Sequence, residues 1–159
     1  MKLAIVSRDG VINQAIAGGV NHRTQLQWLP GSVEALAQLS QAGFTVVIIT
    51  HQPGISRGLL DLDELEAIHS AILNAVEIAG GEVAGVFYCP HDVADNCYCQ
   101  PSQTGILDVI AMEFDADLET ACYFFGGDNN DYHYDYGRRF QCGPQQPLAL
   151  HVQTLLQPN

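Results

Sequence analysis

The sequence predicts an α/β fold in which helices cover both faces of a parallel β-sheet. Three observations favour this class: apolar runs of strand length, amphipathic helical patterns between them, and a regular alternation of the two. The strand runs are nearly continuous in apolar residues, as expected for strands that are covered on both faces. The alternation also implies right-handed crossovers, and hence a doubly wound, Rossmann-like sheet.

Each element follows from the local pattern. We expect strands at residues 3–7, 44–50, 83–89 and 121–125, with a weaker fifth at 148–152. Helices are expected at 32–41, 61–79 and 104–114, because apolar residues recur there every three or four positions. In the second helix, acidic residues lie near the positive end of the helix dipole.

The loops that follow the strands are the expected ligand-binding region. Long loops follow the first strand (8–31) and the third (90–103), and shorter loops follow the second (51–58) and the fourth (126–137). All four leave the carboxyl ends of parallel strands, where such sheets bind ligands. The chain has 159 residues and shows no repeat, low-complexity tract or linker. It is therefore predicted to form a single domain over 1–159.

The charge balance limits the partners. The chain carries 18 acidic and 6 basic residues, a formal charge of -12 at pH 7. Such a surface repels phosphodiester backbones and anionic lipids, so no nucleic-acid or membrane partner is expected. The first apolar run is too short for a signal peptide, and no run approaches the ~20 apolar residues of a membrane span. We therefore expect a cytoplasmic protein. The basic residues are Lys2, Arg8, Arg23, Arg57, Arg138 and Arg139.

A short loop supplies four ligands that suit zinc. The segment CPHDVADNCYC contains Cys89, His91, Cys97 and Cys99, spaced as C-x-H, five residues and C-x-C. Three thiolates and an imidazole complete a tetrahedral site with no open position, which predicts a structural zinc ion. The alternative is a loop disulfide beside a surface histidine, which a reducing compartment disfavours. Of the other cysteines, the one in the fourth predicted strand is expected in the core, and the role of Cys142 stays open.

Two further loops carry candidate site residues. In VSRDGVIN, the first strand ends at Ser7, and Asp9 is either functional or the acidic residue of an ordinary Asp-Gly turn. In THQPGISRG, Thr50, the backbone amides and Arg57 suit an anion such as phosphate, although the loop also reads as a glycine-rich turn. The aromatic cluster at 132–134 is expected to be a packed or exposed loop rather than a site.

Together, SRDGVIN, ITHQPGISRG, YCPH…CYC and the later GGD resemble the haloacid dehalogenase superfamily. More narrowly, they resemble its D-glycero-D-manno-heptose 1,7-bisphosphate 7-phosphatase and histidinol-phosphatase branch. The resemblance runs from Leu3 to about Asp128, and the C-x-H…C-x-C and T-x-Q-x-G-I-x-R-G loops are specific to this branch. It implies a three-layer Rossmann-like fold with a zinc-binding loop and no large cap domain.

The resemblance also implies a reaction. In the family, a first aspartate attacks phosphorus to form an aspartyl-phosphate, and a second aspartate acts as general acid and then base. A hydroxyl and a lysine hold the phosphoryl oxygens, and Mg²⁺ neutralises the remaining charge. Carried over to this chain, Asp9 matches the acid/base position and Thr50 the phosphate-binding hydroxyl. Arg57 belongs to the same phosphate-binding loop, in which His51 stands where the family usually has asparagine.

The metal-binding acid of the fourth loop is also present. Asp128 matches that position, and either Asp131 or Asp135 is a candidate for a second acid. With the carbonyl of Asp9, Asp128 is all that is left of the family's magnesium ligands, so we expect Mg²⁺ to bind weakly.

Two central groups depart from the family pattern. Ser7 occupies the position of the nucleophilic aspartate, and Pro101, after Gln100, occupies the position of the lysine. The only lysine, Lys2, lies at the opposite end of its strand. A serine hydroxyl brings no negative charge to Mg²⁺ and is a poor nucleophile without an adjacent base. Loss of a nucleophile alone lowers turnover by on the order of 10⁴-fold or more.

We therefore expect a zinc-stabilised member of this family that has lost most or all hydrolysis. Its retained role would be binding, either of a phosphorylated sugar or of a protein partner. The alternative is a Mg²⁺-dependent sugar-phosphate phosphatase in which Asp9 or Asp128 works in an unusual way.

Overall fold

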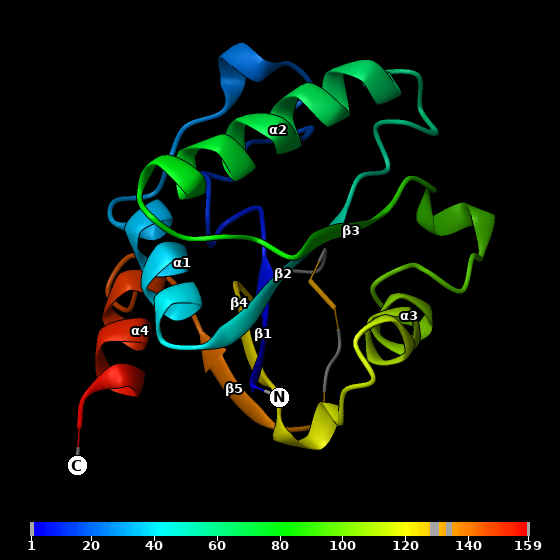
Figure 1. The fold of residues 1–159 in the computed structure, drawn as a ribbon. Coiled ribbons are helices and arrows are strands. Elements are labelled where there is room, and N and C mark those ends of the chain that lie inside the picture. The colour runs from blue at the N-terminus through cyan, green and yellow to red at the C-terminus, as the bar shows by residue number, and fades with distance from the viewer. Residues whose placement is uncertain (1, 128–130, 133–134, 159) are drawn as a thin grey trace.

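The molecule is a parallel five-stranded sheet between two helical layers (Figure 1). The structure, a computed structural model, describes residues 2–127, 131–132 and 135–158. The strands follow the order β3-β2-β1-β4-β5, and every neighbouring pair is parallel. Their bounds are β1 Lys2–Ser7, β2 Phe44–His51, β3 Gly85–Cys89, β4 Cys122–Phe125 and β5 Arg138–Gln141. The helices are α1 Ser32–Gln41, α2 Leu62–Ile78, α3 Gly105–Glu113 and α4 Leu148–Leu156, with 3-10 turns η1 Arg23–Gln25, η2 Val93–Asp95 and η3 Leu118–Thr120.

The two faces of the sheet bury different residues of the same strands. Ala4 and Val6 of β1 pack with α1, α2 and α4 on one face, whereas Leu3 and Ile5 pack toward α3 on the other. This alternation is the period of two that a β-strand imposes, and both sets are apolar because both faces are covered. The three-layer parallel fold expected from the sequence is confirmed. Between β1 and α1 the chain forms only η1, so no large cap domain is inserted there.

One predicted strand is wrong. Residues 148–152 were expected to extend, but they form the first part of α4. Leu148 and Val152 are both buried, and their spacing of four places them on the one helical face that packs against α1. The fifth strand is instead β5, whose sequence RRFQ is mostly exposed and carries two arginines. An edge strand of this kind has no continuous apolar run, so it left no strand signal in the sequence.

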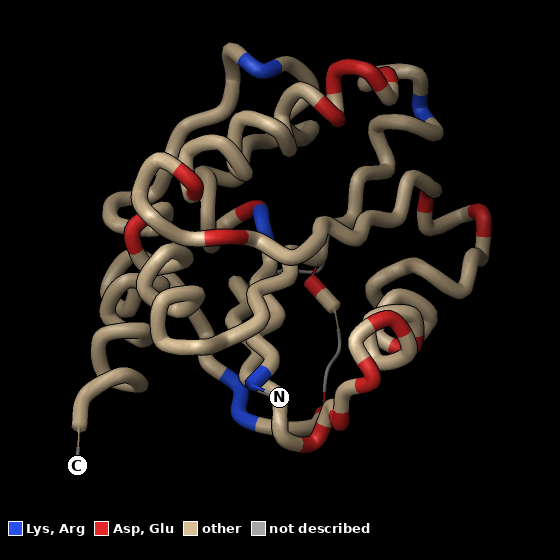
Figure 2. The backbone as a smooth tube through the Cα atoms, viewed as in Figure 1, with Lys and Arg blue, Asp and Glu red and all other residues tan. Residues whose placement is uncertain are grey.

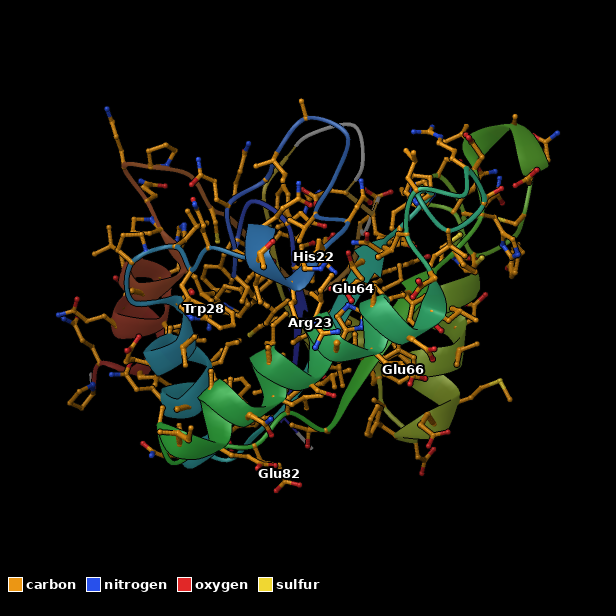
Figure 3. The ribbon with its side chains drawn as sticks, turned by 90° about the horizontal axis from the view of Figure 1, so that it is seen from above. His22, Arg23, Trp28, Glu64, Glu66 and Glu82 are labelled. Atoms are coloured by element: carbon orange, nitrogen blue, oxygen red, sulfur yellow. The ribbon has the colours of Figure 1, made fainter. Side chains whose placement is uncertain are left out.

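The loop after β1 is fastened over α2. The carboxylate of Glu64, in the first turn of α2, accepts hydrogen bonds from the backbone amide of Arg23 at 2.6 Å and from its guanidinium Nη2 at 2.9 Å. Figure 3 shows these two side chains facing one another. The bonds to Arg23 lower the pKa of Glu64 to about 2. Asp61 caps the same helix by accepting from the amide of Glu64.

The parallel arrangement brings the carboxyl ends of β1 to β4 to one edge of the sheet. The loops that leave this edge include the acidic turn, the loop after β2 and the cysteine-rich loop. Among the residues that the structure describes, none of the helices combines the length and the apolar character that crossing a bilayer requires.

Candidate functional site

A cavity of about 280 Å³ lies at the carboxyl edge of the sheet. Its walls come from the loop after β1, from the end of β2 with its following loop, and from Asp131 and Tyr132 beyond β4. Asp9, Thr50, His51 and Arg57, all candidates from the sequence, line it. The other two candidates for this site, Ser7 and Pro101, are buried and are not among the described lining residues.

Asp9 is held by donors on both carboxylate oxygens. Its Oδ1 accepts from the guanidinium of Arg8 (Nη2 at 2.9 Å) and from the amide of Asn13 at 3.0 Å. Its Oδ2 accepts from the amide of Gln52 at 3.0 Å and from the hydroxyl of Thr50 at 3.3 Å. The carboxylate is thus fixed as an acceptor, and the Thr50 hydroxyl, which is expected to hold phosphate, donates to it.

Arg8 is a buried cation beneath the cavity. Its side chain is fully buried, and it joins the Asp9 carboxylate to Nε2 of His69 on α2, at 3.0 Å from Nη1. A guanidinium can only donate, so Nε2 of His69 is the acceptor and the ring is neutral. Burial, followed by the nearby Arg8 charge, lowers the pKa of His69 to about 3. The charge of Arg8 is therefore balanced inside the protein by the Asp9 carboxylate.

Ser7 ends β1 with its hydroxyl directed toward β4. Its Oγ lies 3.3 Å from the phenol oxygen of Tyr123. The Tyr123 hydroxyl donates to the carbonyl of Tyr132 at 3.0 Å, so the Ser7 hydroxyl is the donor of the first bond. The position expected for the nucleophile thus carries a buried, neutral hydrogen-bond donor. The phenol of Tyr132 in turn donates to the carbonyl of Cys99 at 2.7 Å, which connects this corner to the cysteine-rich loop.

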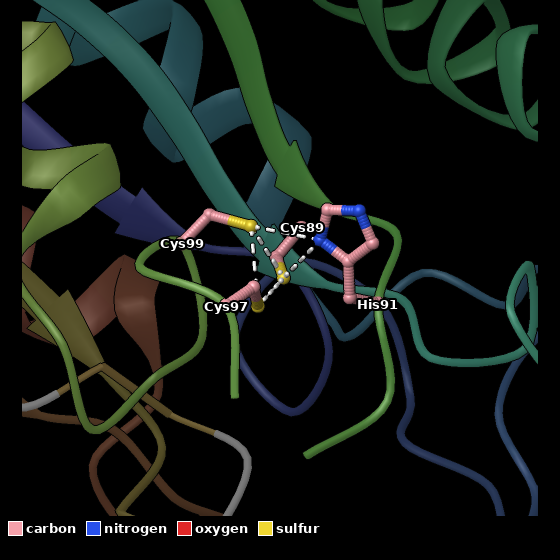
Figure 4. A group of neighbouring side chains, drawn as sticks. All are labelled: Cys89, His91, Cys97 and Cys99. Carbon is pink, nitrogen blue, oxygen red and sulfur yellow. Dashed lines mark hydrogen bonds between the residues drawn. The ribbon is translucent and has the colours of Figure 1, made fainter. Parts of the chain in front are cut away.

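The four predicted zinc ligands converge. Cys89, His91, Cys97 and Cys99 place one ligand atom each within 4.8 Å of all the others (Figure 4). The Sγ atoms of Cys89 and Cys97 are 3.4 Å apart, and Nδ1 of His91 is 3.3 Å from Sγ of Cys99. Such separations suit ligands about 2.0–2.3 Å from a tetrahedral zinc ion. All five cysteines are free thiols, so the alternative of a disulfide is not realised.

The cysteine-rich loop supports one wall of the cavity. The backbone amide of Gln52 donates to the carbonyl of Cys89 at 2.8 Å. Nε2 of His51 lies 2.8 Å from the carbonyl of His91, to which it donates. The guanidinium of Arg57 donates to both carboxylate oxygens of Asp92, at 2.6 and 3.2 Å. The loop after β2 is thereby attached to two of the predicted zinc ligands, Cys89 and His91, and to the neighbouring Asp92. Desolvation of its partly buried ring lowers the pKa of His51.

Two oxygens of the described residues could contribute to the magnesium site expected from the sequence. The Asp131 carboxylate accepts from the amides of Gly126 and Gly127, both at 2.7 Å. A Cβ atom built on Gly126 would lie 3.1 Å from Asp131 Oδ2 and 3.9 Å from the Asp9 carbonyl oxygen, so these two oxygens face the same region. Asp128 lies outside the described residues. Asp135 is exposed, lies 3.7 Å from Arg139 and is not among the described residues that line the cavity. One carboxylate and a carbonyl fit Mg²⁺ only as a partial ligand set.

Several residues of the site had no distinct signal in the sequence. Arg8 and Gln52 lie inside the quoted motifs, but Arg8 also bonds to His69 and Gln52 to Asp9, and both of these partners are distant in the chain. His69 occupies the buried face of α2, where a single histidine looks like a core residue. Tyr123 lies in a strand whose sequence is otherwise apolar and aromatic.

The two cysteines outside the cluster are both buried. Cys142, whose role the sequence left open, is buried after β5, and burial raises the pKa of its thiol to about 12. Cys122 is buried in β4, as predicted.

Comparisons with known proteins agree with the motifs. No family model matches the chain. A D-glycero-beta-D-manno-heptose-1,7-bisphosphate 7-phosphatase of Pseudomonas putida is 42% identical over 133 residues, which cover 82% of this chain and 74% of the relative. A phosphatase of the same description from Pseudomonas aeruginosa is 40% identical over 144 residues, covering 89% and 78%.

The fold comparison agrees. The crystal structure of the D,D-heptose 1,7-bisphosphate phosphatase from B. bronchiseptica, complexed with magnesium and phosphate, superposes with a TM-score of 0.89. It is 33% identical and covers 98% of both chains. The chain therefore belongs to the D-glycero-D-manno-heptose 1,7-bisphosphate 7-phosphatase family of the haloacid dehalogenase superfamily.

Proposed function

We propose that this chain binds a sugar phosphate of the heptose class in the cavity and does not hydrolyse it at a useful rate. The observation that carries the proposal is the environment of Ser7. The residue is 2% exposed, and its hydroxyl is bonded to the hydroxyl of Tyr123. A nucleophile must reach the phosphorus atom and must carry, or easily gain, negative charge. Ser7 does neither in this arrangement.

The missing cation supports the same proposal. Pro101 is buried at the position of the family's lysine, and Lys2 donates to the carbonyl of Ala42 at the amino end of β1. Phosphoryl transfer is accelerated mainly by positioning and charge neutralisation, so a site without this cation loses much of its catalysis. Asp9 retains the geometry of a positioned carboxylate, but its oxygens are bonded to four side chains.

Two metals have different places in this proposal. Zinc fits the cysteine-rich loop with its full ligand set, and there it would hold the loop that supports the cavity wall. Magnesium would be held weakly near Asp131 and the Asp9 carbonyl, with Asp128 as the proposed further ligand; when bound it neutralises phosphoryl charge. Three thiols held close together suit a reducing compartment, which is why we keep the cytoplasm as the proposed location.

A phosphate-release assay tests the proposal. Purified protein with Mg²⁺ should release no phosphate from heptose 1,7-bisphosphate or histidinol phosphate above the buffer control. Ser7→Asp should restore a small turnover, because it supplies both a nucleophile and a metal ligand. Adding Pro101→Lys should raise it more than additively, since both groups would act on one transition state.

One result would contradict the proposal, and a second would contradict the explanation given for it. Robust turnover by the unmodified chain, abolished by Asp9→Asn, would establish a phosphatase that works without an aspartate at position 7. A double variant that folds, retains zinc and still shows no turnover would contradict the view that only these two groups are missing.

A further inference from the structure

A second hollow lies on the outer surface at the start of α1. We call it the Trp28 groove. It has a volume of about 220 Å³ and is lined by residues 28–31, by Val33 and Glu34 of α1, and by Ala75 of α2. The groove shares none of these residues with the cavity at the carboxyl edge, and all of them belong to the described part of the chain. It is therefore a separate feature of the molecule.

Trp28 gives the groove an exposed aromatic wall. It is the single tryptophan of the chain, and it is 41% exposed. Its backbone is held in place, because Trp28 forms an antiparallel bridge with the buried Asn13, and the amide of Leu29 donates to the carbonyl of Ile12 at 3.0 Å. Figure 3 shows Trp28 beside α1, apart from Arg23 and Glu64. An exposed tryptophan on a fixed backbone is typical of the residues that dominate binding surfaces.

Glu34 is the one charged residue among the described residues that line the groove. It is exposed in the first turn of α1, and α1 itself carries no lysine or arginine (Figure 2). The lysine and the five arginines of the sequence all have contacts elsewhere. Arg8, Arg23, Arg57 and Arg139 pair with Asp9, Glu64, Asp92 and Asp135, whereas Lys2 and Arg138 lie over the rings of Phe44 and Phe140. No cation of the chain therefore neutralises Glu34.

An arginine side chain supplies what the groove lacks. A guanidinium is planar, so it can stack on the indole of Trp28 while its N–H groups donate to the Glu34 carboxylate. Leu29, Pro30 and Val33 offer apolar surface to the methylene groups of such a side chain. The volume of the groove is below the ~300–1,000 Å³ of small-molecule sites, which suits one side chain of a larger partner.

We propose that the Trp28 groove is a docking site for an arginine that projects from a basic segment of a protein partner. The formal charge of -12 favours such a segment, because it attracts basic partners and repels acidic ones. This surface is distinct from the cavity. The proposal therefore does not depend on the function proposed above, and neither fails with the other.

A peptide titration of the full, zinc-loaded chain tests the proposal. The probe is a fluorescein-labelled peptide of alternating glycine and arginine, and its lysine counterpart has the same length and charge. Binding is followed by the anisotropy of the label at about 0.15 M salt, where charges more than ~8 Å apart are largely screened. The arginine peptide should bind about threefold or more tightly than the lysine peptide. In a parallel titration with unlabelled peptide, the emission of Trp28, the single tryptophan, should change as the arginine peptide saturates the protein.

Variants locate the binding site. Trp28→Leu removes the aromatic ring and should weaken binding of the arginine peptide by about fivefold, whereas Trp28→Phe keeps a ring and should weaken it by only about twofold. Glu34→Gln should weaken it by about threefold. Glu66→Gln is the matched control, since it removes the same charge from an exposed position of α2 outside the groove, and it should change the affinity by less than about 1.5-fold. Thermal unfolding shows whether each variant is folded.

Four results would overturn the proposal. The first is no binding of the arginine peptide, and the second is equally tight binding of the lysine peptide. The third is an unchanged Trp28 emission at saturation, which would place the peptide elsewhere. The fourth is equal weakening by Glu34→Gln and Glu66→Gln in folded proteins, because binding would then follow the net charge and not the groove.

Discussion

The cysteine-rich loop and the corner around Asp9 lie at the same edge of the sheet but differ in what they retain. The loop holds a full set of three thiols and one imidazole, converging within 4.8 Å. In the Asp9 corner, Asp9 is held by four hydrogen-bonding side chains, and Ser7 and Pro101 are buried. In the function proposed above, the cysteine-rich loop keeps the groups that maintain the architecture, and the Asp9 corner lacks the nucleophile and the lysine of the family.

This contrast changes the physical role of the remaining residues. Asp9 balances a buried guanidinium, and Thr50 and Gln52 complete its hydrogen bonds. A carboxylate that balances a buried guanidinium should stabilise the fold whether or not the chain catalyses any reaction. The comparison therefore predicts that both regions now contribute to stability, the cysteine-rich loop most of all.

The largest effect should come from the zinc ligands. Cys99→Ser removes one of four ligands and should lower the free energy of unfolding by about 4 kcal/mol or more, because metal binding energy is folding energy here. Denaturant unfolding with and without a zinc chelator measures it. Cys142→Ser makes the same chemical change at a buried cysteine outside the cluster and should cost only about 1–3 kcal/mol. If the chelator does not change the free energy of unfolding of the wild-type protein, then no bound metal stabilises the cysteine-rich loop, and this prediction is wrong.

The next largest effect should come from Asp9. Asp9→Asn leaves the Arg8 guanidinium, with 0% side-chain exposure, without a charged partner, and should destabilise the fold by about 3–5 kcal/mol. The double variant with Arg8→Gln should be less destabilised than the sum of the single changes, because both act on one ion pair. Additive effects in denaturant unfolding would show that Asp9 is not the structural partner of Arg8.

The pH dependence of stability should reveal the neutral histidine beneath this pair. The pKa of His69 falls to about 3 in the folded state, so between pH 6.5 and 3 the unfolded chain binds the extra proton. Stability should therefore be complete above pH 6.5 and decrease as the pH falls, by up to about 1.4 kcal/mol per pH unit. The interval between pH 6.5 and 5 is the clearest, because most carboxylates titrate below it.

His69→Gln should flatten this slope while preserving an acceptor for Arg8. An unchanged slope in His69→Gln would assign the pH dependence to other groups.

The smallest effect should come from the bond that joins the two regions. Tyr132→Phe removes the hydroxyl that donates to the carbonyl of Cys99 and should cost about 1–2 kcal/mol. Zinc content should stay the same, since no ligand changes. Loss of zinc from this variant would show that the metal loop depends on the Asp9 corner for its shape, and that the two regions are not separable.

The sequence by itself determined the fold class, the first four strands, the first three helices and the four cysteine and histidine residues that could hold a metal. These follow from local periodicity and from ligand types at short spacing, both of which can be read from neighbouring residues. The sequence also predicted that no lysine serves the site. The single lysine, Lys2, is at the start of the first strand, whereas the site is expected at the ends of the strands.

Only the tertiary structure decided where the arginine charges are neutralised. Arg8 meets His69 and Arg57 meets Asp92 across separations of 61 and 35 residues, and Ser7 meets Tyr123 across 116. The helix over residues 148–156 likewise depends on the face that α1 presents, and β5 on the free edge of β4. Such contacts form where distant segments are packed together, so no local pattern encodes them.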